Sequence, residues 1–441
     1  MQTPIVDFLE KFNLDNPVRL HMPAHKGKVV GYEKDITEIC GADSLFDANG
    51  IILQSENNLS SLYNSAFSVY STEGSSLSIK TTVALVKKYA IAFDKTPLIW
   101  AFRNAHRSFV DAVCLCDIKV KWLNNGNNIY SNKVSLIRLE NALKKAKTKP
   151  TALYITSPDY LGNIAPIKEI KAICEKYSVL LVVDNAHGAY LNFLEENMHP
   201  LHLGADICCD SAHKTLPTLT GGAYLHFNKT SNFFTRELVK QTMKIFASTS
   251  PSYLILESLD KTNKYLFENK DKFSLTAKKV KLLKRILTKK GYKFIGNEPL
   301  KLTIDCNKIG YSAKDIANIL MQNNIFVEFF DEDYLVLMFS PLNSESDFDL
   351  LKNTLLSLEI KKPIIKNIPI LKKHIKKMDI KKAYFSNSEL LEVDKCENRI
   401  LALANISCPP AIPILISGEV ITLEAIKVLK YYKIEKCLVV K

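Results

Sequence analysis

Between residues 61 and 270 the chain alternates short apolar runs with amphipathic stretches, and this alternation is its strongest constraint on the fold. The runs at 98–102, 152–156 and 179–184 are apolar along their length, as strands covered on both faces are. The stretch 166–177 has helical periodicity and begins with proline. The pattern predicts a doubly wound α/β domain with a mainly parallel sheet, whose ligands gather at the carboxyl ends of the strands.

Two reactive side chains fall at predicted strand ends. Asp184 ends the run 179–184, and Lys214 follows about thirty positions later in Ser211-Ala212-His213-Lys214. A pyridoxal phosphate enzyme needs this pair, because the amine forms a Schiff base with the cofactor aldehyde and the carboxylate keeps the pyridine nitrogen protonated. A solvated surface lysine is the alternative, and the spacing of the pair disfavours it.

A chain of 441 residues with 47% hydrophobic residues is expected to divide into one large domain and one or two smaller ones. We expect an irregular amino-terminal segment (1–60), a cofactor-binding large domain (61–270), a small α+β domain (271–360) and a basic connector with a last segment (361–441). A long helical pattern at 252–287 precedes predicted strands at 301–304, 325–329 and 334–339, with helices near 312–322 and 344–358.

Composition bears on partners and location. No run approaches the roughly 20 apolar residues of a membrane helix, and the amino terminus resembles no signal peptide, so a cytoplasmic protein is expected. The ten cysteines lack C-x-x-C spacing, which favours reduced thiols without a metal site. The net charge of +13 is lysine-dominated and densest at 361–382, where a solvated connector is favoured over a nucleic-acid surface. We therefore expect a small-molecule substrate, with no membrane or nucleic-acid partner.

Six short motifs occur in order along nearly the whole chain: His21-x-Pro23-x-His25-Lys26-Gly27, Arg103-Asn104-x-His106, Thr156-Ser157-Pro158, Asp184-x-Ala186-His187-Gly188, Ser211-x-His213-Lys214-Thr215 and Pro409-Pro410-x-Ile412-Pro413. In this set and order the chain resembles the Orn/Lys/Arg decarboxylase family, fold type I pyridoxal phosphate enzymes that act on basic amino acids. The resemblance implies a large domain like that of the fold type I transferases and α-decarboxylation of lysine, arginine or ornithine.

The resemblance also assigns roles around the cofactor ring. It makes Lys214 the Schiff-base lysine and proton shuttle, and Asp184 the partner of the pyridinium nitrogen. His187 would approach the phenolic oxygen, while Ala186 packs beneath the ring. His106 would stack on the opposite ring face; a helix-capping or core histidine is the alternative.

The phosphate is expected where a strand turns into a helix, at Gly74-Ser75-Ser76, because backbone N–H groups and hydroxyls there make an anion site. Ordinary capping by the serines is compatible with that role. Ser211 and His213 would add donors. Thr249 resembles a residue that reaches the phosphate of the neighbouring subunit, which implies a homodimer with shared sites.

Several positions depart from the family pattern. Glu73 stands where relatives carry a neutral asparagine, and a carboxylate there is unfavourable beside a phosphate unless its side chain points away. The other departures are Asn185 for glutamate, Tyr190 and Phe46 for histidines, and Cys408, Ala411 and Ser417 for tyrosine, glycine and proline. A homologue that binds the cofactor but has altered or lost activity is therefore one alternative.

The choice of reaction depends on how the substrate is held. The chain has no arginine between Arg285 and Arg399, so it lacks the small-domain clamp with which transaminases hold the substrate carboxylate, and this favours decarboxylation. An aminotransferase or another fold type I lyase is the next alternative. The candidate partners for the distal substrate cation are Glu419, Asp159 and Asp43. The motif at His21 begins so early that the wing domain of larger relatives is absent, which predicts a dimer or tetramer.

Overall fold

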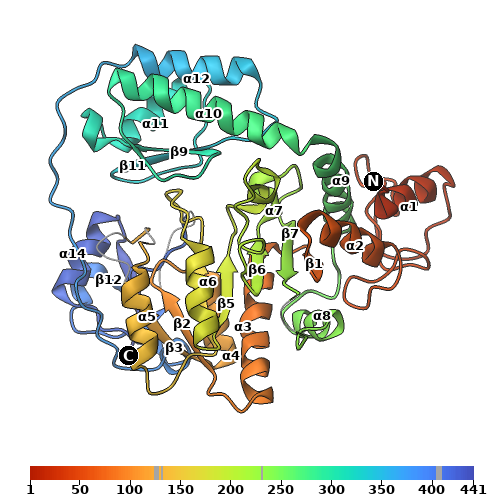
Figure 1. Cartoon of the computed structure of the whole chain (residues 1–441), viewed down its shortest axis with the longest axis horizontal. Coiled ribbons are helices and arrows are strands. Elements are labelled where there is room, and N and C mark those ends of the chain that lie inside the picture. The colour runs from red at the N-terminus through yellow and green to blue at the C-terminus, as the bar shows by residue number, and fades with distance from the viewer. Residues whose placement is uncertain (124–128, 131–132, 230–231, 404–409) are drawn as a thin grey trace. The chain divides into compact units, whose positions relative to one another are not determined.

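The computed structural model describes residues 1–123, 129–130, 133–229, 232–403 and 410–441 (Figure 1). The chain forms two compact units, each built from separated segments. Unit 1 contains residues 1–100, 135–157 and 166–273, and unit 2 contains residues 101–134, 158–165 and 274–441. The division into the four segments expected from the sequence remains a prediction.

A seven-stranded sheet with the order β1-β7-β6-β5-β4-β2-β3 is the main layer. Its strands are β1 (Phe67–Ser71), β2 (Leu98–Phe102), β3 (Lys119–Leu123), β4 (Ala152–Thr156), β5 (Leu180–Asp184), β6 (Ile207–Asp210) and β7 (Ala223–Phe227). β4, β5 and β6 run parallel, and β7 is antiparallel to both β6 and β1. β5 is buried over its whole length, as its apolar sequence predicts. The mainly parallel sheet is confirmed.

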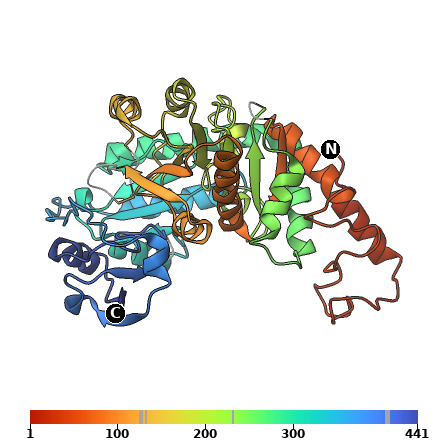
Figure 2. The same ribbon diagram turned by 90° about the horizontal axis from the view of Figure 1, so that it is seen from below.

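Helices of unit 1 cover both faces of this sheet, with α3 on one side and α6 on the other (Figure 2). The helices of unit 1 are α1 (Pro4–Leu14), α2 (Ile51–Tyr63), α3 (Gly74–Ala92), α5 (Leu136–Lys145), α6 (Ile167–Lys176), the 3-10 turn η1 (Ala189–Phe193), α7 (Ala212–Thr215), α8 (Arg236–Lys244) and α9 (Tyr253–Asn269). α6 matches the predicted helix at 166–177, with Pro166 at its amino-terminal cap.

The expectation that residues 1–60 are irregular is wrong at both ends of the segment. α1 buries Ile5, Val6 and Leu9, and the Asp260 carboxylate accepts hydrogen bonds from the first two amides at 2.9 and 3.1 Å. α2 begins after Gly50, whose amide donates to Asp43 at 2.8 Å. Both helix starts are held by carboxylates outside the helices themselves, and these tertiary partners are invisible to local periodicity.

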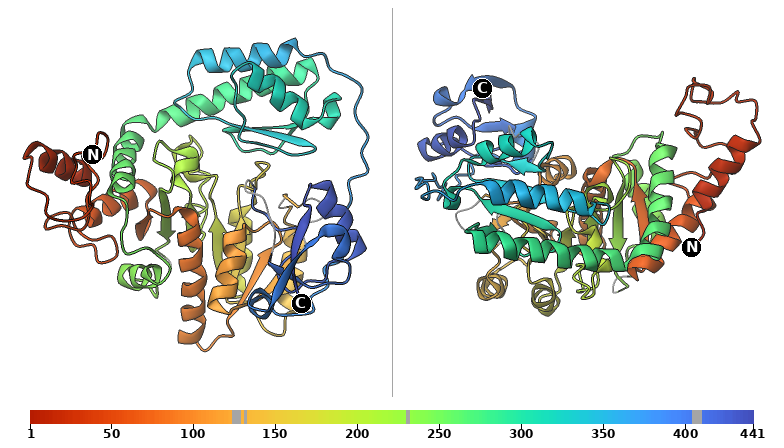
Figure 3. Two further views of the ribbon diagram at one scale, coloured as in Figure 1. Left: turned by 180° about the vertical axis from the view of Figure 1, so that it is seen from behind. Right: turned by 90° about the horizontal axis from the view of Figure 1, so that it is seen from above.

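Unit 2 contains two antiparallel sheets, with the orders β10-β11-β9-β8 and β12-β14-β13. The strands are β8 (Phe294–Ile295), β9 (Lys301–Asp305), β10 (Phe329–Phe330), β11 (Tyr334–Met338), β12 (Ser388–Glu392), β13 (Leu401–Leu403) and β14 (Lys436–Val440). The helices are α4 (Arg107–Cys116), α10 (Asp271–Lys290), α11 (Ala313–Gln322), α12 (Glu345–Ser357), α13 (Ile380–Tyr384) and α14 (Leu423–Tyr431), with 3-10 turns η2 (Asn307–Ile309) and η3 (Val393–Lys395). Residues 271–273 at the start of α10 belong to unit 1. α10 and α12 lie over one face of the four-stranded sheet (Figure 3).

The helical pattern at 252–287 is confirmed as α9 and α10, separated at Lys270. The strand predicted at 325–329 is wrong except at its end, because β10 contains only Phe329 and Phe330. Phe326 is 80% exposed, so this apolar run does not mark a buried strand. Among the described residues, no helix is long and apolar enough to span a membrane.

Candidate active site

Lys214 lies in the one-turn helix α7, directly after β6. Its Nζ is 3.2 Å from Nε2 of His187, which follows the end of β5. His187 is buried, and Lys214 is partly buried. Adjacent parallel strands therefore bring together an amine and an imidazole that are 27 positions apart in the chain.

Asp184 is the last residue of β5 and is 1% exposed. Its Oδ2 accepts a hydrogen bond from the Tyr154 hydroxyl at 3.0 Å, and its Oδ1 accepts one from the Ala186 amide at 3.3 Å. Burial raises the pKa of Asp184, although the Lys214 charge and the Tyr154 bond act in the opposite direction. A buried carboxylate with few donors gains most from a cationic N–H partner.

The predicted anion site lies at the start of α3, where two hydroxyl groups meet. Gly74 adopts φ +68°, which suits glycine, and its amide donates to the Gly221 carbonyl at 2.7 Å. The Ser211 hydroxyl donates to the Ser75 hydroxyl at 2.7 Å. Two hydroxyls from distant parts of the chain thus meet at the amino terminus of a 19-residue helix, where the helix dipole favours an anion.

Glu73 immediately precedes this helix, and its carboxylate has a specific partner. The Ser248 amide donates to Glu73 Oε1 at 2.8 Å. Thr249, the next residue, is exposed. The residue that departs from the family's asparagine therefore anchors the loop that carries Thr249.

The structure places the two remaining predicted histidines in local contacts. His213 lies in α7, with its Nδ1 3.0 Å from the Gly222 carbonyl. His106 is the cap of α4 in unit 2, where its Nδ1 accepts the Ser108 amide at 3.1 Å. The helix-capping alternative for His106 is thus observed, and its stacking on a cofactor ring stays a prediction.

Two candidate substrate carboxylates organise loops instead. Asp43 accepts hydrogen bonds from five backbone amides at 2.8–3.4 Å, those of residues 44 and 49 on Oδ1 and those of residues 50, 52 and 53 on Oδ2. Asp159 is fully buried; its Oδ1 accepts the Leu161 and Asn163 amides and its Oδ2 the Asn163 side-chain amide, at 2.8–3.0 Å. Every oxygen of both groups already has a protein donor.

The third candidate, Glu419, is the anion of a buried ion pair in unit 2. The guanidinium of Arg103 donates to both of its oxygens, at 2.6 and 3.0 Å, and the Ile416 amide donates to Oε2 at 2.9 Å. Burial acts to raise the pKa of Glu419, but the bonds and charges of His374 and Arg103 lower it to about 2. Glu419 was expected to bind the cation of a substrate, but in the structure it binds the guanidinium of Arg103.

Two candidate functional residues, Tyr154 and Glu328, were not predicted from the sequence. Tyr154 lies two residues before the end of β4, and that position alone signalled that its hydroxyl could approach the strand-end cluster. Glu328 lines a cavity of about 400 Å³ in unit 2, with the aromatic rings of Tyr130, Phe329 and Tyr432. Its side chain accepts one hydrogen bond within the described residues, from Tyr160 at 3.1 Å, and the charged residues Lys314 and Lys433 line the same cavity.

The departures in the last segment are partly described. Ala411 adopts φ +52°, a left-handed conformation that glycine, the residue of the family pattern, adopts without strain. Cys408 and Pro409 lie outside the described residues.

Residues 10–297 match the family model described as Orn/Lys/Arg decarboxylase, major domain, and residues 371–438 match Orn/Lys/Arg decarboxylase, C-terminal domain. YaaO of Bacillus subtilis is 29% identical, with 97% of this chain and 93% of YaaO covered. An arginine decarboxylase of Bacillus subtilis is 27% identical, with 96% of this chain and 92% of that protein covered. A lysine decarboxylase of Francisella novicida has a similar fold, with a TM-score of 0.81, 16% identity, and coverage of 100% of this chain and 81% of that one.

Proposed function

We propose that this chain, which belongs to the Orn/Lys/Arg decarboxylase family and is thus an amino acid decarboxylase, removes the α-carboxylate of a basic amino acid with pyridoxal phosphate. The observation that carries the proposal is the cluster at the ends of β4, β5 and β6. It combines the Lys214 amine, His187 at 3.2 Å and a buried Asp184 bonded to Tyr154.

The donor set fits pyridoxal phosphate group by group. A lysine amine suits the aldehyde, and a buried carboxylate with raised pKa suits a pyridinium N–H. The start of α3 with Ser75 and Ser211 suits the phosphate dianion. Gly74 leaves open space where a Cβ would stand, which keeps the approach to the helix amides clear. The proposed cofactor-binding residues are Gly74, Ser75, Ser76, His106, Asp184, Ala186, His187, Ser211, His213, Lys214 and Thr249.

When bound, the cofactor supplies an aldehyde for a primary amine and a protonated ring that accepts the electron pair left by a departing carboxylate. Asp184 holds the proton on the ring nitrogen, and Tyr154 fixes that carboxylate by one hydrogen bond. Lys214 returns a proton to the substrate Cα, which replaces the bond lost to carbon dioxide. His187 keeps the Lys214 amine directed into the site. The products are the amine and CO2.

The chain's arginines support decarboxylation over transamination. The sequence has none between Arg285 and Arg399, and Arg399 is bound to Glu389 and to the Val440 carbonyl, both at 2.7 Å. A substrate carboxylate left without a bidentate guanidinium in an apolar site is destabilised relative to neutral CO2.

For the distal cation of the substrate, Glu419, Asp159 and Asp43 stay the proposed candidates, and each of these carboxylates already accepts hydrogen bonds from the protein. We propose arginine, lysine or ornithine as substrate, with arginine tested first because of the arginine decarboxylase among the relatives.

The setting of the reaction follows from the same proposal. We place the enzyme in the cytoplasm, in polyamine metabolism, as a homodimer in which the exposed Thr249 of one subunit reaches the phosphate of the other. Analytical ultracentrifugation of the purified protein tests the dimer.

The test of function is carbon dioxide release from arginine, lysine and ornithine by the purified, cofactor-loaded protein. Lys214→Ala is expected to remove the visible absorbance of the bound cofactor and to lower turnover by at least about 1,000-fold. Lys88→Ala, on the exposed face of α3, is the matched control and should retain both. If an amino acid alone converts the cofactor to pyridoxamine phosphate without CO2, the enzyme is an aminotransferase. If the wild-type protein binds no pyridoxal phosphate, the proposal fails.

A further inference from the structure

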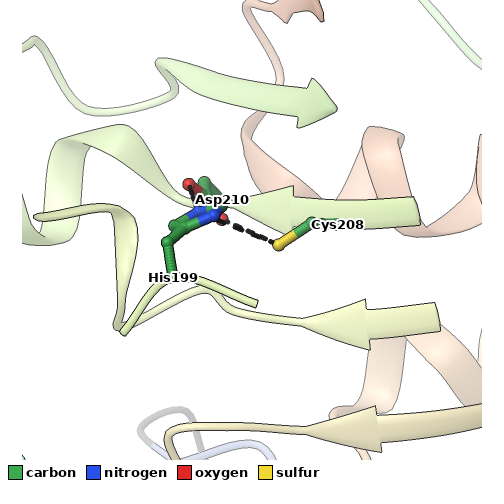
Figure 4. A group of neighbouring side chains, drawn as sticks. All are labelled: His199, Cys208 and Asp210. Atoms are coloured by element: carbon green, nitrogen blue, oxygen red, sulfur yellow. Dashed lines mark hydrogen bonds and ion pairs between the residues drawn. The ribbon is translucent and has the colours of Figure 1, made fainter. Parts of the chain in front are cut away.

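A second cluster of reactive side chains lies behind the candidate site, inside unit 1. Asp210, the last residue of β6, is fully buried, and Figure 4 shows the side chains of His199 and Cys208 directed toward it. His199 Nε2 is 2.9 Å from Asp210 Oδ2, and Cys208 Sγ donates to Oδ1 at 3.4 Å. His226, on the neighbouring strand β7, has its Nε2 3.4 Å from Oδ2. All four side chains are inaccessible to solvent.

His, Cys and Asp at these distances are potential metal ligands, but the proton positions argue against a metal. The Leu201 amide donates to His199 Nδ1 at 3.2 Å, so that nitrogen carries the lone pair and Nε2 carries the proton. A histidine that binds a metal through Nε2 needs the opposite arrangement, with a proton on Nδ1. The cluster is therefore better described as a buried carboxylate that accepts hydrogen bonds from several side chains.

The His–Asp contacts keep Asp210 ionised. Burial acts to raise its pKa, but the contacts of Asp210 with His199 and His226 hold the pKa of this carboxyl well below its usual range. Burial lowers the pKa of His226 despite its contact with Asp210. A fixed negative charge with donors on both oxygens is a strong hydrogen-bond acceptor.

The fourth donor to this carboxylate comes from the candidate active site. Asn185 Nδ2 donates to Asp210 Oδ1 at 2.8 Å, and both residues are fully buried. Asn185 directly follows Asp184, and its own amide donates to the Cys209 carbonyl at 2.9 Å. The side chain fits so closely over Gly188 that a Cβ there would come within 2.0 Å of Asn185 Oδ1. The Asn185 amide group is therefore held between the turn 184–188 and Asp210.

We propose that Asn185 and Asp210 are positioning residues of the cofactor site. Their hydrogen bond fixes the turn that carries Asp184, Ala186 and His187, and so sets where the ring nitrogen and the Lys214 amine meet their partners. Asp210 also directly precedes Ser211, whose hydroxyl donates to Ser75. The residue that holds Asn185 beside the proposed ring site is therefore adjacent in the chain to a residue of the proposed phosphate site. This inference rests on the proposed pyridoxal phosphate site and adds two residues to it.

The test compares two substitutions that separate the hydrogen bond from the space that the side chain fills. Asn185→Ala removes the donor and leaves a small gap. Asn185→Asp keeps the shape but sets a second carboxylate against Asp210. If the side chain only fills space, Asn185→Asp is the milder change; if it donates to Asp210, Asn185→Asp is the more damaging one. Cys208→Ala is the matched control, because it removes a donor to the same carboxylate without touching the turn.

The measurements are the dissociation constant of pyridoxal phosphate, the visible spectrum of the bound cofactor and the melting temperature of the apoprotein. We expect Asn185→Ala to weaken cofactor binding about tenfold with an altered ratio of visible bands, Asn185→Asp to weaken it further, and Cys208→Ala to change the affinity by less than about twofold. If Asn185→Asp does not fold, Asn185→Ala decides alone.

Three outcomes overturn the inference: wild-type affinity and spectrum in Asn185→Ala, tighter binding by Asn185→Asp than by Asn185→Ala, or a stoichiometric metal ion that is lost in His199→Ala. Failure of the wild-type protein to bind the cofactor is a different result, because it refutes the proposed function.

Discussion

The Arg103–Glu419 pair gives a prediction that separates a structural carboxylate from one that binds substrate. Glu419→Gln keeps the shape of the side chain and removes its charge. The guanidinium of Arg103 and the Ile416 amide, which donate to this carboxylate at 2.6–3.0 Å, then face a neutral amide. The Arg103 and Glu419 side chains are 13% and 7% exposed, so water cannot replace the lost partner fully.

The pKa of Glu419 and the usual cost of breaking a buried ion pair both indicate how much stability Glu419→Gln loses. The fall of the Glu419 pKa from 4.5 to about 2 corresponds to about 3 kcal/mol of folded-state stabilisation of the ionised form. Breaking a buried ion pair by removing one partner costs about 3–5 kcal/mol. We therefore expect Glu419→Gln to lower the free energy of unfolding of unit 2 by about 3 kcal/mol at neutral pH.

The pH dependence has a defined sign. Because the folded-state pKa of Glu419 is depressed, its contribution is complete above about pH 4.5 and is lost as pH falls toward 2. The stability difference between wild type and Glu419→Gln should therefore shrink over that range.

Urea unfolding followed by tryptophan fluorescence is the assay. The chain has two tryptophans, and the Arg103 guanidinium lies 5.5 Å from the ring centre of Trp122, so a Trp100→Phe background reports on unit 2. A double-mutant cycle with Arg103→Met should give a coupling of about 2–3 kcal/mol. A Glu419→Gln protein with unchanged urea midpoint and a raised KM for a basic amino acid would refute the structural assignment and restore Glu419 as the substrate's partner.

Three further predictions concern single contacts. Tyr154→Phe removes the hydrogen bond that orients the Asp184 carboxylate and should weaken pyridoxal phosphate binding by about tenfold in an equilibrium titration, because the acceptor for the ring nitrogen is then less firmly held. Glu73→Gln keeps an acceptor for the Ser248 amide but removes a negative charge beside the start of α3; the affinity of the apoprotein for inorganic phosphate should rise about two- to fivefold, whereas an unchanged affinity would show that the charge has no effect there. Ala411→Gly relieves the positive φ and should raise the melting temperature of unit 2 by a few degrees, corresponding to about 1 kcal/mol; a lower temperature would contradict the strain.

Strands and helices of the large α/β layer were predictable because they carry continuous apolar runs and capped amphipathic stretches. β2 and β4 have the predicted bounds, and β5 begins one residue later. The family was recognised from its motifs, and the family models match the same regions. α1 and α2 were missed because their starts are held by carboxylates outside the helices, Asp260 far along the chain and Asp43 seven positions before Gly50, which helical periodicity does not reveal.

Within the site, Asp184 and Lys214 were predictable because each sits in a motif at a strand end. Tyr154 was not, because its role depends on which strand lies beside β5. The acidic candidates could not be ranked from the sequence for a related reason. The sequence around a carboxylate at a turn does not distinguish a residue that binds substrate from one that pairs with Arg103. That distinction requires the contact between residues separated by more than 300 positions.

The placement of β7 between β1 and β6 has a consequence for synthesis on the ribosome. β1 and the start of α3 emerge early, but β1 has no hydrogen-bonding neighbour in the large sheet until β7 has been made. Ser75 likewise waits for Ser211, 136 positions later. The nascent chain therefore carries an unpaired strand edge for most of the time needed to make the large domain, a period in which it is prone to aggregation and open to chaperones. Both contacts form only at the end of that interval, once Ser211 and β7 have been made.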